Sequence, residues 1–192
     1  NEEKVENNKI NLTLEVSETE KFYVEKINIL GNDITLENVI RDSLEVDEGD
    51  PFNELLHAKS INNLKARNIF GSVTSEVLDG PDLNTKIINI NIEEKPTGEI
   101  TLAAGVGTEG GTMGFSVSEN NFMGRGVKLS TSLRVSENSI KGNFTTYNPN
   151  YNYSGKSLST NIQSSQTNKM EDNGYDSTKT GFSLGTSLEQ YE

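Results

Sequence analysis

One glycine pattern in this chain could support phosphate chemistry. The run Gly105–Gly110 reads G-V-G-T-E-G, which has the spacing of a dinucleotide-binding loop. Such a loop must open a helix, because the helix N-terminal dipole holds the pyrophosphate. The residues that follow, from Gly111 to Phe115, alternate as in a strand. We therefore predict a glycine-rich hairpin here and no nucleotide site.

An acidic cluster and a single histidine are the other chemical candidates. Glu171, Asp172 and Asp176 lie around Gly174, but their spacing fits no EF-hand calcium loop. We predict an acidic loop between two strands. His57 falls in a predicted helix without a Cys, Ser or His partner at a convincing spacing, so we predict a surface or half-buried helix residue. We expect no enzymatic activity, no metal site and no cofactor.

Composition divides the chain in two. Residues 1–96 hold 20 acidic side chains, 10 basic side chains and 4 glycines. Residues 97–192 hold 9 acidic side chains, 7 basic side chains and 13 glycines. These opposed shifts indicate a domain boundary near Pro96.

The net charge of -12 argues against a nucleic-acid partner, which needs clustered cations. The absence of cysteine excludes disulfides and thiolate metal sites.

The first half mixes strand and helix patterns. Period-two spacing predicts strands at Phe22–Leu30, Val73–Leu78 and Lys86–Glu94. In the first strand the apolar residues switch from even to odd positions between Val24 and Ile27, which indicates a bulge.

Two helices are predicted between the first and second of these strands. Thr35 is the expected N-cap of a short helix, and Asn53 is the expected N-cap of a longer helix at 54–67. The short helix has an apolar face made of Leu36, Val39, Ile40 and Leu44. The longer helix is expected to bury Leu55, Leu56, Ala58, Ile61 and Leu64. The order is therefore strand, helix, helix, strand, strand.

A short internal similarity links the start of the chain to the last of these strands. The segment Ile10–Glu15 resembles Ile88–Glu93 at an offset of 78 residues. A repeat of that length would make residues 1–19 the final strand of a preceding copy of the module. A coincidence between two amphipathic strands is the alternative.

From residue 99 onward the apolar period is two, over six segments of about 8–11 residues. The opposite positions carry Gly, Ser, Thr and Asn with scattered Lys and Arg, as the wet lumen of a barrel would. The apolar positions are Ile100, Leu102, Ala104 and Val106; Met113, Phe115 and Val117; Val127, Leu129, Leu133 and Val135; Ile140 and Phe144; Leu158 and Ile162; and Phe182, Leu184 and Leu188.

A membrane β-barrel explains this pattern better than a soluble β-sandwich or soluble barrel, which would also alternate. Phe122, Tyr147, Tyr151 and Tyr153 lie near strand ends, where an interfacial girdle is expected. Six strands cannot close a transmembrane barrel, since the smallest type needs about eight. We therefore expect the barrel to be incomplete in this chain and to continue beyond Glu192, or else to pair with strands of another chain.

Several motifs resemble the Omp85 family of outer-membrane protein assembly factors. The segment Phe22–Glu94 resembles a POTRA domain, with its β-α-α-β-β order and its Gly31-Asn32 turn. The runs Thr97–Gly111, Glu119–Gly126 and Tyr147–Pro149 resemble the start of the family's barrel. The pair Asp42-Ser43 differs from the Arg-Glu pair that relatives often show at an accessory-lipoprotein contact.

The resemblance implies a fold and a division into domains. The fold is an α+β POTRA domain (β-α-α-β-β) followed by an antiparallel membrane β-barrel. Residues 1–19 would be the C-terminal strand of a preceding POTRA-like repeat, 20–95 a POTRA domain, and 96–192 the N-terminal strands of the transmembrane barrel.

The resemblance also implies a function. Such proteins receive unfolded β-barrel clients in the periplasm of a Gram-negative bacterium and insert them into the outer membrane by strand-edge pairing at a lateral seam. The implied partners are these clients, accessory lipoproteins and outer-membrane lipid. The seam strand would be Glu99, Ile100, Thr101, Leu102, Ala103, Ala104, Gly105, Val106 and Gly107. The POTRA edge strand would be Val73, Thr74, Ser75, Glu76, Val77 and Leu78.

Two other functions stay open. One is a two-partner-type secretion pore of the same superfamily, which passes its substrate through the lumen. The other is a soluble periplasmic binding protein whose second half is a β-sandwich.

Overall fold

The structure is a computed structural model that describes residues 4–6, 9–11, 20–107, 110–170 and 174–188. At the N-terminus, β1 (Lys4–Glu6) and β2 (Lys9–Asn11) pair as a small antiparallel hairpin. β1 and β2 are part of residues 1–19, which we predicted to be the final strand of a preceding copy. The rest of that strand lies outside the described residues, so the assignment of 1–19 to a preceding repeat stays a prediction.

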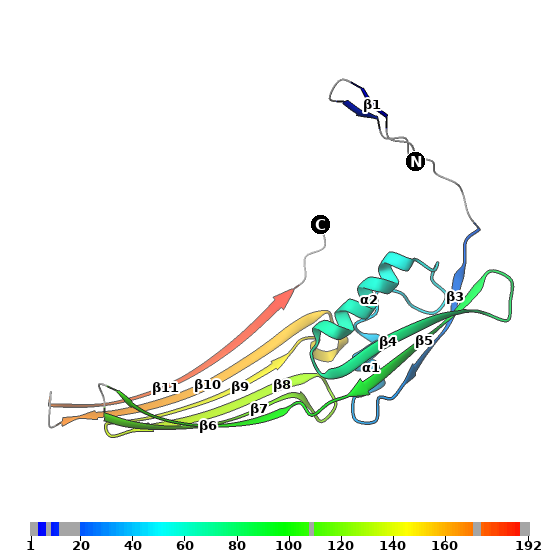
Figure 1. The fold of residues 1–192 in the computed structure, drawn as a ribbon. Helices are drawn as coiled ribbons and strands as arrows, with labels where there is room; N and C mark the ends of the chain where they lie inside the picture. Colours follow the sequence, from blue (N-terminus) through cyan, green and yellow to red (C-terminus); the bar gives the residue numbers. More distant parts are fainter. Residues whose placement is uncertain (1–3, 7–8, 12–19, 108–109, 171–173, 189–192) are drawn as a thin grey trace.

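The first module has a three-stranded sheet with helices against it (Figure 1). Its elements are β3 (Tyr23–Leu30), α1 (Glu37–Arg41), α2 (Glu54–Ala66), β4 (Phe70–Asp79) and β5 (Thr85–Glu94). β5 is the central strand, parallel to β3 and antiparallel to β4. The predicted order is confirmed. The predicted bulge is also confirmed, because the register of β3 on β5 shifts between Val24 and Lys26.

The core of this module lies between the helices and one face of the sheet. Ile88 and Ile90 on the central strand are 1% exposed, and Ile40 and Leu64 on the helices are fully buried. The complete set of buried apolar residues is Val24, Ile27, Val39, Ile40, Val46, Ile61, Leu64, Ile69, Phe70, Val73, Ile88, Ile90 and Ile92.

The predicted N-cap of α1 is wrong. The capping position is Leu36, which makes no side-chain cap hydrogen bond, and the helix has five residues. The Thr35 side chain is instead 2% exposed and accepts a hydrogen bond from the Asn121 amide, 2.8 Å away in the second module. A tertiary contact therefore takes the hydroxyl that a local cap would have used. Leu36, expected on the buried face, is 44% exposed.

The cap of α2 is confirmed, but part of its expected buried face is wrong. The Asn53 carboxamide oxygen accepts hydrogen bonds from Leu55 N at 2.9 Å and Leu56 N at 3.3 Å. Leu55, Leu56 and Ala58 are nevertheless exposed. The buried face instead contains Ser60, Ile61 and Leu64. Ser60 tolerates burial because its hydroxyl donates to Leu56 O and accepts from Glu45 N, both at 2.8 Å.

The second module is a six-stranded antiparallel meander, ordered β11-β10-β9-β8-β7-β6, and the sheet is open as described (Figure 1). Each of the six predicted segments is a strand of 10–14 residues. The strands are β6 (Gly98–Gly107), β7 (Gly110–Phe122), β8 (Val127–Ser136), β9 (Ser139–Asn148), β10 (Lys156–Lys169) and β11 (Tyr175–Leu188), with a short 3-10 turn, η1 (Tyr151–Tyr153), between β9 and β10. No helix in the described part of the chain is long and apolar enough to span a bilayer.

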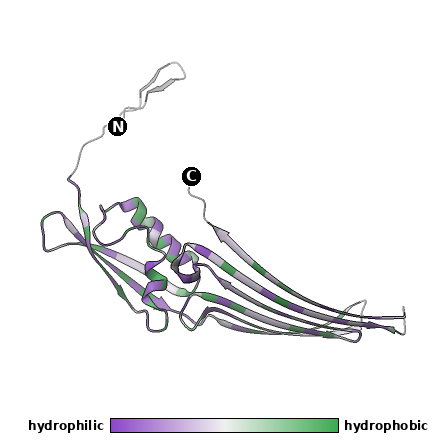
Figure 2. Ribbon diagram, turned by 180° about the vertical axis from the view of Figure 1, so that it is seen from behind, coloured by the Kyte–Doolittle hydropathy of each residue, from purple (hydrophilic) through white to green (hydrophobic). Residues whose placement is uncertain are grey.

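The strand registers align the apolar positions across the whole sheet. Directly opposed residues share a face, and Figure 2 shows hydrophobic and hydrophilic residues interleaved along the strands. One row crosses all six strands through Ile100, Val117, Thr131, Phe144, Ile162 and Phe182. The next polar row runs through Thr101, Ser116, Ser132, Asn143, Gln163 and Gly181. The sheet therefore has one apolar face and one polar face.

Candidate strand-pairing edges

Among the strands that the structure describes, β6 forms one edge of the large sheet and pairs only with β7. Every residue of β6 is exposed, and Val106 is 91% exposed. All nine residues predicted for the seam, 99–107, lie in this strand. An edge strand presents unpaired N–H and C=O groups, which can pair with another extended chain.

The side chains between β6 and β7 are small near the end of the strand pair. Ala103 lies opposite Gly114, and Gly107 lies opposite Gly110. Cross-strand side-chain contacts supply much of the stability of a pair of strands, and glycine contributes none. The side-chain contribution to pairing is therefore low in this part of β6.

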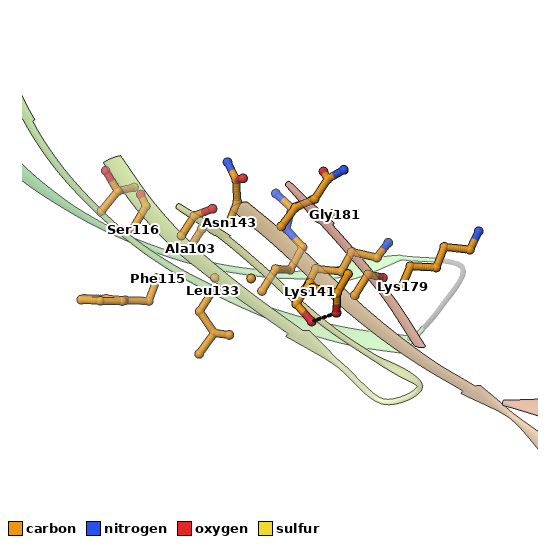
Figure 3. Close-up of a pocket in the computed structure, with 17 residues that line it drawn as sticks. Ala103, Phe115, Ser116, Leu133, Lys141, Asn143, Lys179 and Gly181 are labelled. Carbon is orange, nitrogen blue, oxygen red and sulfur yellow. Dashed lines mark hydrogen bonds between the residues drawn. The ribbon is translucent and has the colours of Figure 1, made fainter. Parts of the chain in front are cut away.

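The polar face of the large sheet carries a row of cations that we did not predict from the sequence. Arg134 lies opposite Lys141, Lys141 opposite Ser165, and Ser165 opposite Lys179. These residues line a hollow of about 620 Å³. In Figure 3, Lys141 and Asn143 project to one side of the sheet, while Phe115 and Leu133 project to the other.

Within the described residues, none of these three cations forms an ion pair. The alternation in the sequence placed each cation on the polar face of its own strand. Their alignment in one row depends on the register between strands, which no single segment contains.

β4 is an edge of the smaller sheet, because β5 is the only described strand that pairs with it. The six residues predicted for the POTRA edge, 73–78, all lie in β4. Val73 is buried against the core, whereas Thr74, Ser75 and Glu76 are exposed. This strand therefore has a free backbone edge next to exposed polar side chains.

His57 is half-buried, as predicted, but it has a serine neighbour that sequence spacing did not suggest. Its Nε2 atom lies 2.9 Å from the Ser75 hydroxyl on β4. Burial lowers the pKa of His57, against the opposing charge of Glu54, so the ring is neutral at pH 7. The contact joins α2 to the face of β4.

The other two chemical candidates can be placed as well. The glycine run Gly105–Gly110 connects β6 to β7, with Gly107 opposite Gly110, so the predicted hairpin is confirmed. Asp176 lies in β11, and Glu171 and Asp172 lie outside the described residues.

The POTRA family model, described as "Surface antigen variable number repeat", matches residues 22–95. The outer membrane protein assembly factor BamA of Neorickettsia risticii (strain Illinois) is 34% identical over 131 residues, which are 67% of this chain and 17% of that protein. BamA of Neisseria meningitidis serogroup B is 26% identical over 151 residues, which are 78% of this chain and 19% of that protein. The chain thus spans less than a fifth of the length of these relatives.

Two solved structures share the fold. BamA from Haemophilus ducreyi lacking POTRA domains 1–3 has a TM-score of 0.72 at 22% identity and covers 84% of this chain and 31% of that structure. CdiB from Escherichia coli has a TM-score of 0.59 at 15% identity and covers 89% of this chain and 34% of that structure. Both matches extend over most of the two modules.

Proposed function

Because the chain belongs to the Omp85 family and carries a POTRA domain at residues 22–95, we propose that it takes part in outer-membrane protein assembly. In this proposal the POTRA domain receives unfolded β-barrel clients in the periplasm of a Gram-negative bacterium. The strands from β6 onward belong to a membrane barrel, and β6 is the seam at which client strands pair. No covalent chemistry is needed for this activity.

The observation that carries the proposal is the position of β6. Of the six described strands in the large sheet, it is the edge strand that follows directly after the POTRA domain. It is exposed along its whole length. A client strand that pairs with it gains backbone hydrogen bonds, which do not depend on the client's sequence. Such pairing suits an activity that accepts many different clients.

The apolar face of the sheet supports a membrane location. On β6 the apolar residues run from Ile100 away from the POTRA domain to Val106. On β11 the apolar residues Phe182 and Leu184 lie toward the POTRA end, and Thr180 follows them on the same face. From β6 to β11 the band of apolar residues therefore moves toward the POTRA end of the sheet. Tilted strands that cross a flat bilayer have this shift, because the membrane cuts successive strands at successive levels.

Aromatic residues gather at the POTRA end of the sheet. Phe122 ends β7 opposite Val127 on the apolar face, and Tyr151 lies in η1. Tyr147, in contrast, is paired with Lys128 and Ser159 and so lies on the polar face, not in the predicted girdle. Tyr and Trp favour the interface between lipid and water. This arrangement supports a periplasmic POTRA domain next to the inner leaflet of the outer membrane.

Photo-crosslinking tests the seam. A photoreactive amino acid replaces Thr101 on β6 of the intact protein, and a client barrel is then added during assembly. We expect client capture at Thr101, because a strand paired with β6 lies about 5 Å away. Ser132 is the matched control, since it lies in the same row on β8, which is paired on both sides. Capture of clients is measured by mobility shift and mass spectrometry.

The positions that capture a substrate separate the rival functions. Capture at Thr101 without capture at Ser132 supports pairing at the seam. Capture at Ser132 without capture at Thr101 would contradict it and favour the secretion pore, whose substrate passes along the polar lumen. A protein that stays in the aqueous fraction without detergent would favour the soluble binding protein.

We also propose that β4 holds unfolded clients by the same kind of strand pairing. The matched positions are Glu76 on this edge and Asn89, its opposed residue on the central strand β5. A photoreactive residue at Glu76 is expected to capture an unfolded client peptide, and one at Asn89 is not. Equal capture at both positions would indicate contact with the sheet face instead of the edge. The measurement uses the intact protein with a labelled client peptide.

Accessory lipoproteins remain proposed partners. The pair Asp42-Ser43 lies where the resemblance would have placed such a contact. The Ser43 side chain is buried, and its hydroxyl accepts a hydrogen bond from Arg67 Nε at 2.6 Å. Ser43 is therefore engaged inside the molecule, whereas Asp42 is exposed, so a lipoprotein would have to use Asp42 or other exposed residues nearby.

A further inference from the structure

The loop before α1 contacts the turn that joins β7 to β8. Leu36 N donates a hydrogen bond to Gly124 O at 2.9 Å. The Asn121 side chain, 8% exposed, donates to Thr35 Oγ1 at 2.8 Å. Its carboxamide oxygen accepts from Gly126 N at 2.7 Å. One buried amide thus connects the two modules and also shapes the turn.

The POTRA side of this contact is held by a carboxylate at the end of β5. Glu94 accepts hydrogen bonds from Ile34 N at 2.8 Å and from Thr35 N at 2.6 Å. Burial alone would raise the pKa of Glu94. The hydrogen bonds from the Thr35 hydroxyl and from the two backbone N–H groups outweigh burial, so the pKa of Glu94 is lowered. The Thr35 hydroxyl therefore donates to Glu94 and accepts from Asn121.

The turn approaches the POTRA loop so closely that one position requires glycine. Gly124 has φ +69°, and a Cβ atom there would lie 2.1 Å from Ile34 O. Gly155, between η1 and β10, has φ +68° but no atom within 4 Å of its Cβ position. The two glycines share a backbone conformation and differ in their contact with the POTRA domain.

A second contact lies at the connection between β9 and β10. Asp42 and Arg67 of the first module lie in one cleft with Asn150 of this connection. Partial burial raises the pKa of Asp42, against the effects of Arg67 and Asn150. These groups line a cleft of about 420 Å³ between the modules, together with Arg125 and Tyr151.

We infer that these two contacts form a built joint that holds the POTRA domain and the strands β7–β10 as one rigid body, with Asn121 as its main positioning residue. A single contact would leave the domain free to rotate about it. Two contacts, on two different turns of the sheet, fix its orientation. The joint therefore sets the direction of the β4 edge relative to the β6 edge. It does not depend on the proposed function.

Distance measurements between spin labels test the joint. The chain contains no cysteine, so cysteines introduced at Leu83 and Asn143 give one label in each module. Leu83 is 96% exposed, and Asn143 is also exposed. Pulsed electron–electron double resonance on the intact protein in lipid nanodiscs is expected to give one narrow distance distribution. Asn121→Ala and Thr35→Val each remove the shared hydrogen bond and should broaden it.

Glycine substitutions provide the matched control. Gly124→Ala and Gly155→Ala impose the same backbone strain, but only the first places a methyl group against Ile34 O. We expect Gly124→Ala to shift or broaden the distance distribution and Gly155→Ala to leave it unchanged.

Two further measurements make the result decisive. Circular dichroism establishes that each variant keeps its sheet and helices. A short thiol-to-thiol crosslinker applied to Leu36→Cys combined with Arg125→Cys should join the two modules rapidly and leaves Thr35 and Asn121 unchanged, because these two exposed residues line the same cleft between the modules. The inference is wrong if the pair does not crosslink, or if folded Asn121→Ala and Gly124→Ala keep the distribution of Gly155→Ala. Client assembly is measured separately. A variant that loses client assembly but keeps the distance distribution would contradict the proposed function and not the joint.

Discussion

Leu64→Ala is expected to lower the free energy of unfolding of the POTRA domain by about 3 kcal/mol. Leu64 is fully buried in the core between α2 and the sheet. Its replacement removes apolar contacts and leaves a cavity that the surrounding strands can fill only in part. Urea unfolding of the intact protein, followed through the helical circular dichroism signal, measures this change.

Leu83→Ala is the matched control for this prediction. It is the same substitution at a residue that is 96% exposed, in the turn between β4 and β5. Its effect should stay within about 0.5 kcal/mol, as for most surface substitutions. Similar losses at the two positions would mean that α2 does not pack on the sheet as described.

Phe144→Lys is expected to destabilise the membrane-inserted protein by about 2–4 kcal/mol, the range for a lysine at the bilayer midplane. Phe144 lies on β9 in the apolar row that crosses all six strands. On this face a lysine ammonium would have to leave water for hydrocarbon. The fraction of folded protein recovered in outer membranes, and its unfolding in lipid vesicles, measure the effect.

Asn143→Lys is the matched control for the membrane face. Asn143 is the neighbouring residue on the same strand, but it lies in the polar row with Ser132 and Thr101. A lysine there would face the wet side of the sheet, next to the existing Lys141, and should be tolerated. Equal tolerance of both lysines would contradict a lipid-facing apolar surface.

Local patterns were sufficient to predict the elements of both modules. Period-two spacing identified all six strands of the large sheet, because a strand with one apolar face must alternate. The change of parity between Val24 and Ile27 indicated the bulge in β3. Asn53 was recognised as the cap of α2 because the bond that it makes reaches only two or three residues along the chain. Each of these features depends on near neighbours in the sequence.

Tertiary contacts decided where local chemistry allowed two outcomes. Thr35 had the side chain of an N-cap, yet its hydroxyl bonds to Asn121, which lies 86 residues further along the chain. Leu55 had the character of a core residue, but it is 81% exposed because the sheet meets the face of α2 that contains Ile61 and Leu64. Helical periodicity describes spacing around the helix and not which side the sheet will cover.

The sequence by itself determined the two modules, their strands and the one-sided character of the large sheet. These follow from spacing and composition, which act over a few residues. Only the tertiary structure decided that β4 and β6 are edges among the described strands, that three cations share a row, and that Asn121 joins the modules. Those features depend on strand order and register, which are set by packing between segments far apart in the chain.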